Sequence, residues 1–212
     1  IFSIITAMEL YWFPSRGCGR GILASVMEHT IEITGLAFGG KGIGRIDGKV
    51  VFVDYAAPGD TARVRITADK KSYFEGELAG LVSPSVDRCE PVCPHFGICG
   101  GCSLQHMSYA SQLRWKQEIL AGTLKRIGGV EPVAFDGPPP SPGQLGYRSR
   151  ASFHVHGRDW GFFEAASNRV VDIDDCPVLD ARLNSIYKER PACKRQAEVA
   201  DAAAKVCHPL AP

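Results

Sequence analysis

Residues 30–66 read TIEITGLAFGGKGIGRIDGKVVFVDYAAPGDTARVRI, and this stretch decides the fold. Apolar and polar residues alternate along TIEIT and TARVRI, which is the pattern of half-buried strands. The segment KVVFVDY between them is rich in β-branched and aromatic residues, which favour strands. The turns GGKGIGR and APGD separate these runs, and a further strand-like run, SYFEGELAGLV, follows. Short strands at even spacing predict a small β-barrel over residues 27–86.

The glycines of this stretch do not form a nucleotide-binding loop. Gly39, Gly40, Gly42 and Gly44 depart from the G-x-G-x-x-G spacing. A strand rather than a helix is expected after them, which is the wrong context for phosphate binding. We interpret the glycine run as a hairpin turn.

Four segments of different character follow the barrel. They are a cysteine-containing loop (87–107), a helix (108–128), a Pro/Gly-rich linker (129–146) and part of a central β-rich domain (147–187). Ser108 is a candidate N-cap and Gly128 is a candidate stop. Helical apolar spacing comes from Leu113, Lys116 by its aliphatic stem, Leu120, Leu124 and Ile127. The chain is therefore expected to be mainly β with α+β character.

The two ends of the chain stand apart from this pattern. Strong alternation begins only after Met27, so we expect residues 1–26 to be a non-native or disordered extension. Residues 188–212 are rich in alanine without a clear apolar stripe, and we expect an atypical or truncated tail. The first residues have no basic start and no small-residue cleavage site, so they do not resemble a signal peptide. No run approaches about 18 apolar residues, so we expect a cytoplasmic protein with no membrane segment.

Composition alone does not decide the partner. The chain has 24 Lys and Arg against 23 Asp and Glu, a formal net charge of +1. A local basic patch can bind nucleic acid inside a neutral chain, so an RNA partner must be argued from motifs.

Three cysteines lie close together on the loop. Cys93, Cys99 and Cys102 have the spacing C-x5-C-x2-C, with PHFGI and GG between them. Clustered cysteines in a chain without an export signal indicate a metal centre. A complete all-cysteine shell needs a fourth thiolate, and Cys89 is near while Cys176 is distant. Zinc sites usually contain paired C-x2–4-C units, which fits poorly, but spacing alone leaves iron–sulfur and zinc both open.

The stretch CPHFGICGGCSLQH resembles the cluster motif of the bacterial RNA (uracil-5-)-methyltransferases that modify ribosomal RNA. The resemblance implies a [4Fe-4S] cluster whose last ligand lies in a segment similar to VVDIDDCPVL. Carried over by position, the ligands would be Cys93, Cys99, Cys102 and Cys176. Cys89 would then be a bystander.

The 30–66 stretch resembles the TRAM domain, an OB-like barrel that this family carries at its N-terminus. Such barrels bind single-stranded nucleic acid with a basic groove and aromatic stacking positions. The stretch LGYRSRASFHVHG resembles the central β-domain of the family. Candidate RNA-binding residues in the two regions are Phe38, Lys41, Arg45, Lys49, Arg148 and Arg150. A core position for Phe38, or salt bridges from the two later arginines to Asp172, Asp174 or Asp175, are the structural alternatives.

The resemblance also implies what the chain lacks. The family binds S-adenosylmethionine, and holds its catalytic cysteine and base, in a C-terminal Rossmann-like domain. No strand, glycine turn and helix follow residue 180, and Cys193 and Cys207 lie in the alanine-rich tail. We therefore expect no Rossmann-like domain, no catalytic or cofactor-binding residues, and no methyl transfer by this chain alone. S-adenosylmethionine would be used only by the full-length family.

The leading interpretation is the RNA-recognition and [4Fe-4S]-binding portion of such an enzyme, monomeric and acting on ribosomal RNA. One alternative is a stand-alone, non-catalytic RNA-binding module with an iron–sulfur or zinc centre. A zinc-ribbon-like adaptor is another. A radical methylthiotransferase is a third alternative. Its C-x3-C-x2-C motif is not met, because five residues rather than two separate Cys93 from Cys99.

Overall fold

The fold is that of a computed structural model, which describes residues 28–130, 137–157 and 159–189. The expected extension at residues 1–26 lies outside the described residues. So do residues 131–136 of the linker and residues 190–212, which include Cys193 and Cys207.

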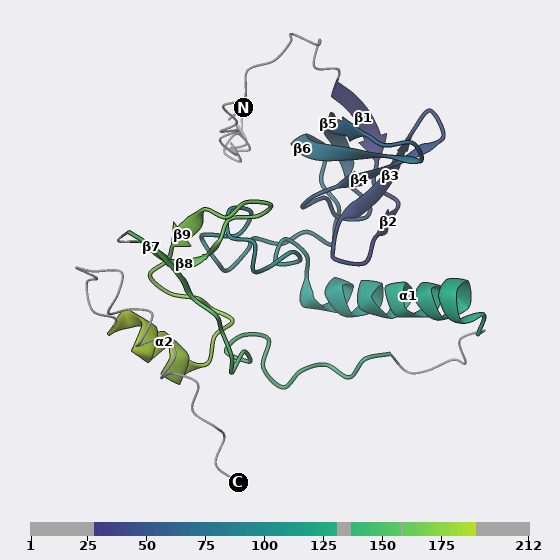
Figure 1. The fold of residues 1–212 in the computed structure, drawn as a ribbon. Helices are drawn as coiled ribbons and strands as arrows, with labels where there is room; N and C mark the ends of the chain where they lie inside the picture. Colours follow the sequence, from purple (N-terminus) through teal and green to yellow (C-terminus); the bar gives the residue numbers. More distant parts are fainter. Residues whose placement is uncertain (1–27, 131–136, 158, 190–212) are drawn as a thin grey trace, which may run out of the picture.

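Six strands form the barrel predicted from the alternating sequence (Figure 1). They are β1 (Glu28–Glu32), β2 (Gly35–Leu36), β3 (Gly42–Ile46), β4 (Lys49–Val53), β5 (Thr61–Asp69) and β6 (Tyr73–Ser83). Their order in the sheet is β1-β5-β6-β4-β3-β2, and every pair is antiparallel except β4 with β6. The sheet curls back on itself, so that β3 lies against β1.

Glycine at position 44 allows that approach. A Cβ atom there would lie 3.0 Å from the Glu32 carbonyl oxygen and 2.7 Å from the Ile31 Cδ1 atom. Any side chain at position 44 would therefore push β3 away from β1. The barrel interior holds the apolar residues of each alternating run, which are Ile31, Ile33, Ile46, Val51, Val53, Ala56, Ala62 and Val64.

A buried carboxylate joins the barrel to the segment that follows it. Asp60 is fully buried, and its oxygens accept hydrogen bonds from the backbone N–H of Ala57 (2.6 Å) and of Ser85 (2.9 Å). The Arg88 guanidinium donates to the same carboxylate through Nε (2.8 Å) and Nη2 (2.7 Å). Arg88 Nη2 also donates to the Tyr55 carbonyl oxygen at 2.9 Å. Because a planar fork meets both carboxylate oxygens, the start of the cysteine loop is held in one orientation.

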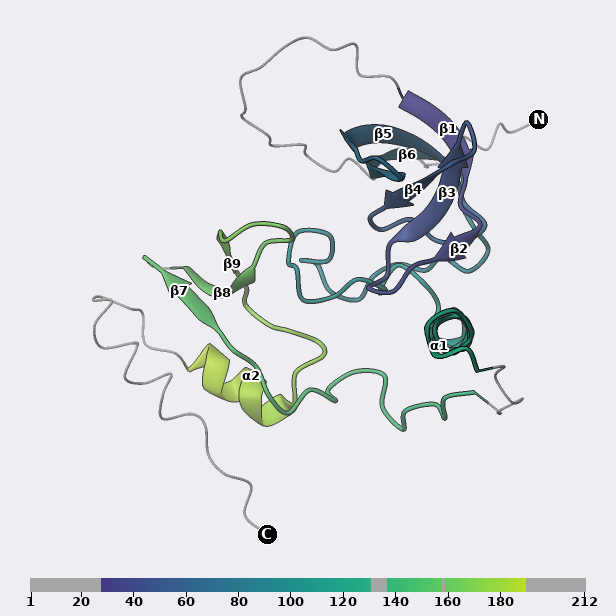
Figure 2. The same ribbon diagram turned by 45° about the vertical axis from the view of Figure 1, so that its right-hand side comes forward.

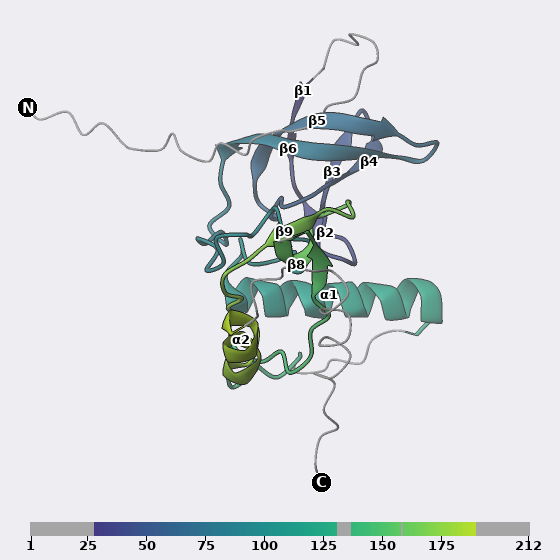
Figure 3. The ribbon, with the colours of Figure 1, turned by 60° about the vertical axis from the view of Figure 1, so that its left-hand side comes forward.

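Helix α1 (Tyr109–Gly128) runs along the underside of the barrel (Figures 1 and 3). Ser108 is the N-cap, since its hydroxyl accepts from the Ser111 N–H at 3.3 Å. The C-cap is Gly129, one residue after the predicted stop, with a left-handed φ of 62° that favours glycine.

The face of α1 that packs on the barrel is not the predicted apolar stripe. Trp115 and Ile119 pack against the buried cluster of Leu36, Ala57 and Met107. Leu120 and Leu124, taken from the sequence as part of the apolar stripe, are exposed on the far side. The spacing predicted a helix correctly. The face that packs on the barrel is the one that carries Trp115 and Ile119, and not the one that carries Leu120 and Leu124.

A second, three-stranded sheet lies across the cysteine loop from the barrel (Figures 1 and 2). Its antiparallel strands are β7 (His154–His156), β8 (Asp159–Phe163) and β9 (Val170–Asp172), and helix α2 (Ala181–Lys188) follows. Tyr187 of α2 is buried and stacks on Phe153, with ring centroids 4.6 Å apart. The described residues are therefore mainly β with two helices, and neither helix is long and apolar enough to cross a membrane.

We predict that Asp60→Ala destabilises the chain by about 3–5 kcal/mol, because it leaves the Arg88 charge unpaired in a largely buried position. Asp54→Ala is the matched control. Asp54 pairs with Lys41 at 3.0 Å on the exposed surface of the same barrel, where a pair contributes about 1 kcal/mol or less. Urea denaturation measures both free energies of unfolding. Equal losses for the two variants would contradict the role given to Asp60.

Candidate metal centre and nucleic-acid interface

The cysteine loop, residues 87–107, is closed at its base by hydrogen bonds between its two ends. The Cys89 N–H donates to the His106 carbonyl oxygen at 3.0 Å, and the Cys93 N–H donates to Gln105 Oε1 at 3.1 Å. The two arms of the loop therefore run side by side, and Cys93 is tied to the returning arm.

The tip of the loop is bound to the second sheet. The Gly100 N–H donates to the Phe163 carbonyl oxygen, and the Ala165 N–H donates to the Ile98 carbonyl oxygen, both at 2.9 Å. A Cβ atom at position 100 would lie 3.2 Å from the same Phe163 oxygen, so glycine permits the contact. Cys99, between these two bonds, is thereby brought to the sheet edge.

Cys176 reaches the same region from far along the chain. Its N–H donates to Asn184 Oδ1 at 3.1 Å and to Asp175 Oδ1 at 3.0 Å. The Asn184 Nδ2 in turn donates to the Cys176 carbonyl oxygen at 2.9 Å. This two-way clamp from α2 holds the backbone of Cys176, whose side chain is only 8% exposed.

The four cysteines Cys93, Cys99, Cys102 and Cys176 lie near one another. Cys102 packs against the buried cluster that contains Cys176. Burial raises the pKa of the Cys93, Cys99 and Cys176 thiols, and the negative charge of neighbouring thiolates raises each pKa further. Such mutual effects arise only between groups that lie close together. A metal bound there would have to displace the thiol protons, which couples metal binding to pH.

Within residues 28–130, 137–157 and 159–189, no three His, Cys, Asp or Glu side chains are close enough to ligate one ion. Cys89 stands apart from the group, because its exposed sulfur faces the Gln105 carbonyl oxygen at 3.5 Å.

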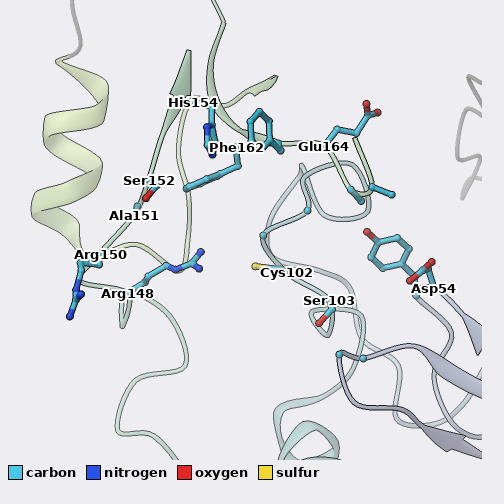
Figure 4. A pocket seen from close by; sticks show the side chains of 18 residues that line it. Asp54, Cys102, Ser103, Arg148, Arg150, Ala151, Ser152, His154, Phe162 and Glu164 are labelled. Carbon is cyan, nitrogen blue, oxygen red and sulfur yellow. The ribbon is translucent and has the colours of Figure 1, made fainter. Parts of the chain in front are cut away.

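A cleft of about 660 Å³ opens beside the thiols. The barrel contributes Asp54 and Tyr55 to its walls, and the loop contributes Cys102. The second sheet contributes His154 and Phe162, and the segment before β7 contributes Arg148. Figure 4 shows the Arg148 side chain directed toward the Cys102 sulfur, whereas the Arg150 side chain points away from it. The cleft therefore lies where all three parts of the structure meet.

The barrel residues expected to bind RNA differ in their exposure and in the partners that their side chains already have. Phe38 is 90% exposed at the turn between β2 and β3, so it is not a core residue. Arg45 Nη1 donates to the Gly48 carbonyl oxygen at 2.8 Å within its own hairpin. Lys41 pairs with Asp54 at 3.0 Å.

Lys49 also has a carboxylate partner. It forms an ion pair with Asp69, and its ammonium lies 3.9 Å from the Phe74 ring centre. In the described part of the chain, Arg148 and Arg150 form no ion pair with a carboxylate, and Asp175 pairs instead with Lys188 at 3.6 Å.

Two aromatic residues at the junction were not singled out from the sequence. Tyr55 has a left-handed φ of 60°, and its ring meets Phe96 edge-on with centroids 5.2 Å apart. Phe96 lies against the His106 ring at 5.6 Å, and His106 is 3% exposed. Burial, followed by the nearby Arg88 charge, lowers the pKa of His106 to about 4. Their positions depend on contacts between barrel and loop, which leave no local signal in the sequence.

Known proteins similar to this chain are RNA-modifying enzymes. The TRAM domain matches residues 26–79. An uncharacterized RNA methyltransferase of Aquifex aeolicus is 35% identical over 156 residues, covering 74% of this chain and 37% of the relative. The 23S rRNA (uracil(1939)-C(5))-methyltransferase RlmD of Acidithiobacillus ferrooxidans is 45% identical over 149 residues, covering 68% of this chain and 34% of the relative. The likeness thus extends beyond the barrel, and the chain spans about a third of the length of these relatives.

A solved structure is also similar. The Pyrococcus abyssi tRNA (uracil-54, C5)-methyltransferase, in complex with S-adenosyl-L-homocysteine, is 28% identical. The match covers 77% of this chain and 35% of that chain, with a TM-score of 0.48.

The buried histidine generates a prediction of pH dependence. The pKa of His106 is about 4 in the fold and about 6.5 in an unfolded chain. Below pH 6.5 the unfolded chain therefore binds a proton that the folded chain does not, and stability falls with pH down to about 4. We expect His106 to account for about 2 kcal/mol of the loss between pH 7.5 and pH 5. Urea denaturation at the two pH values measures this loss.

His106→Gln is expected to remove that part of the pH dependence. His156→Gln, at an exposed position of β7, is the control and is expected to keep the wild-type slope. A wild-type slope in both variants would show that His106 is not the group that titrates.

Proposed function

Because this chain belongs to the TRAM-domain RNA (uracil-C5-)-methyltransferases and spans about a third of such relatives, we propose that it forms their RNA-recognition and [4Fe-4S]-binding part. The observation that carries the proposal is the approach of four cysteines from two distant segments. The RNA substrate, by similarity to the 23S rRNA enzyme of Acidithiobacillus ferrooxidans, is ribosomal RNA.

The donor set fits an iron–sulfur cluster. Four thiols suit an all-cysteine shell, and each thiolate of a four-iron core binds a different iron, so the sulfurs stand farther apart than around one ion. Gly101 lies against this group, because a Cβ atom there would be 3.4 Å from the Cys99 sulfur. The residues that would hold the cluster are Cys93, Cys99, Cys102 and Cys176. When bound, the cluster would supply a covalent connection between the loop and the Cys176 segment.

The chain's own residues prepare that connection. The Gly100 contact with Phe163 and the Asn184 clamp on Cys176 bring the two segments together through protein hydrogen bonds. The cluster would close a long loop in the chain, and closing a long loop restrains the unfolded state strongly. We therefore assign the centre a structural role in joining barrel and second sheet.

The cleft between barrel and second sheet is the proposed path of the RNA. Arg150 lines it, and the exposed Phe38 directly precedes Gly39, which also lines it. These side chains can bind a phosphate and stack on a base. Lys41 would bind phosphate by exchanging Asp54, which costs little for an exposed surface pair. Arg45 and Lys49 would have to leave the Gly48 carbonyl oxygen and the Asp69 carboxylate to do the same. Methyl transfer from S-adenosylmethionine is assigned to residues of the family outside this described part, and the chain alone is expected to transfer no methyl group.

Metal analysis of cysteine variants tests the cluster. We expect the anaerobically purified chain to contain iron and acid-labile sulfide in equal amounts. Serine at position 93, 99, 102 or 176 should each remove most of the iron, because it takes away one thiolate ligand. Cys89→Ser is the matched control and should keep the full cluster. One equivalent of zinc without iron would overturn the cluster in favour of a zinc module.

RNA binding tests the cleft independently of the metal. Stacking on an aromatic ring contributes about 1–3 kcal/mol per base, so Phe38→Ala should raise the Kd for single-stranded RNA roughly 5- to 150-fold. Val86→Ala, at a fully exposed apolar residue away from the cleft, should leave the Kd unchanged. Fluorescence anisotropy with a labelled uridine-containing RNA at fixed salt measures both. An unchanged Kd for Phe38→Ala would remove this residue from the interface.

A further inference from the structure

Arg148 carries a positive charge whose placement the RNA proposal does not explain. It is half-buried, whereas Arg150 two residues later is exposed. No carboxylate of the described residues forms an ion pair with it. A half-buried charge without a partner is costly, so the structure around Arg148 should hold a negative group.

The backbone of Arg148 is bound to the segment that carries Cys176. The Arg148 N–H donates to the Val178 carbonyl oxygen at 2.8 Å, and the Asp180 N–H donates to the Arg148 carbonyl oxygen at 3.0 Å. The two segments form a parallel bridge at Arg148 and Leu179. Arg148 is therefore positioned by the same segment as the distant cysteine, just beyond the Cys176 position.

The side chain of Arg148 is directed at the thiols. Figure 4 shows it extending toward the Cys102 sulfur across the cleft. A Cβ atom at position 101 would lie 4.0 Å from Arg148 Nη1 and 3.4 Å from the Cys99 sulfur, so the guanidinium and this thiol both lie against Gly101.

The net charge of a four-thiolate centre gives a reason for a cation at the position of Arg148. Four thiolates around a doubly positive core, whether a [4Fe-4S] core or zinc, leave a net charge of about −2. A partly buried site with that charge is stabilised by a nearby cation, and net charge is one of the properties that set the potential of an iron–sulfur cluster. Arginine suits the task because it stays protonated and is weakly hydrated.

We propose that Arg148 is the counter-ion of the cysteine-bound centre, a positioning residue that holds and tunes the metal rather than a contact for RNA. The inference rests on the proposed function, since it needs a metal centre on the four cysteines. Arg150, which points away from the sulfurs and is exposed, remains the RNA-binding candidate of the pair.

The test compares Arg148→Gln, Arg148→Lys and Arg150→Gln in the full chain, purified anaerobically. Loss of positioning partners around metal ligands typically weakens metal binding 10- to 100-fold. We expect Arg148→Gln to lose its iron to a chelator about tenfold faster than the wild type, and to show a lower reduction potential. The potential falls because the more negative reduced state loses its cation. Arg148→Lys, which keeps the charge, should stay close to the wild-type potential, and Arg150→Gln should match the wild type in both measurements.

The outcomes separate the two proposals. A wild-type chain that binds no iron would overturn the proposed function, and with it the role of Arg148. A fully loaded wild type, with Arg148→Gln indistinguishable from Arg150→Gln in chelator rate and potential, would overturn the role of Arg148 alone. A weaker RNA affinity of Arg148→Gln with an unchanged cluster would return this residue to the RNA interface.

Discussion

The carboxylate of Asp60 is the point at which the barrel and the cysteine loop become one structure. It is fully buried and accepts four hydrogen bonds, two from backbone N–H groups and two from Arg88. Arg88 directly precedes Cys89, so the direction in which the loop leaves the barrel is fixed before the first cysteine. The cleft, the position of Tyr55 and the approach of the loop to the second sheet all depend on that direction.

The centre is assembled from two partly independent supports. The loop cysteines are positioned from the barrel through the Asp60–Arg88 ion pair. Cys176 is positioned from α2 through its hydrogen bonds with Asn184. Within the described residues, backbone hydrogen bonds at Gly100 and Ala165, together with the packing of Cys102 against the Cys176 cluster, join the two supports near the thiols. A metal centre at this junction would therefore stabilise the arrangement of barrel and second sheet, and with it the width of the cleft that we assign to RNA.

Local pattern was enough to predict the barrel strands, the Ser108 cap and the grouping of the three loop cysteines, because alternation, capping and loop spacing are short-range properties. It left the fourth ligand open, and Cys176 was named only from the resemblance to a family. It did not reveal the buried face of α1, where Trp115 is preferred over Leu120 and Leu124. Nor did it reveal the ion pairs of Lys41 and Lys49, the burial of His106 or the direction of Arg148. Each of these depends on segments far apart in the sequence, so a pattern read along the chain has no access to it.

The central claim is that Cys93, Cys99, Cys102 and Cys176 surround one inorganic centre at the junction of the barrel and the second sheet. X-ray absorption at the iron edge of the anaerobically purified chain tests it most directly, because it reports the atoms that surround each iron. The account predicts a shell of sulfur alone with iron neighbours just beyond it. Iron bound to nitrogen or oxygen without a neighbouring iron, or no bound iron, would contradict it.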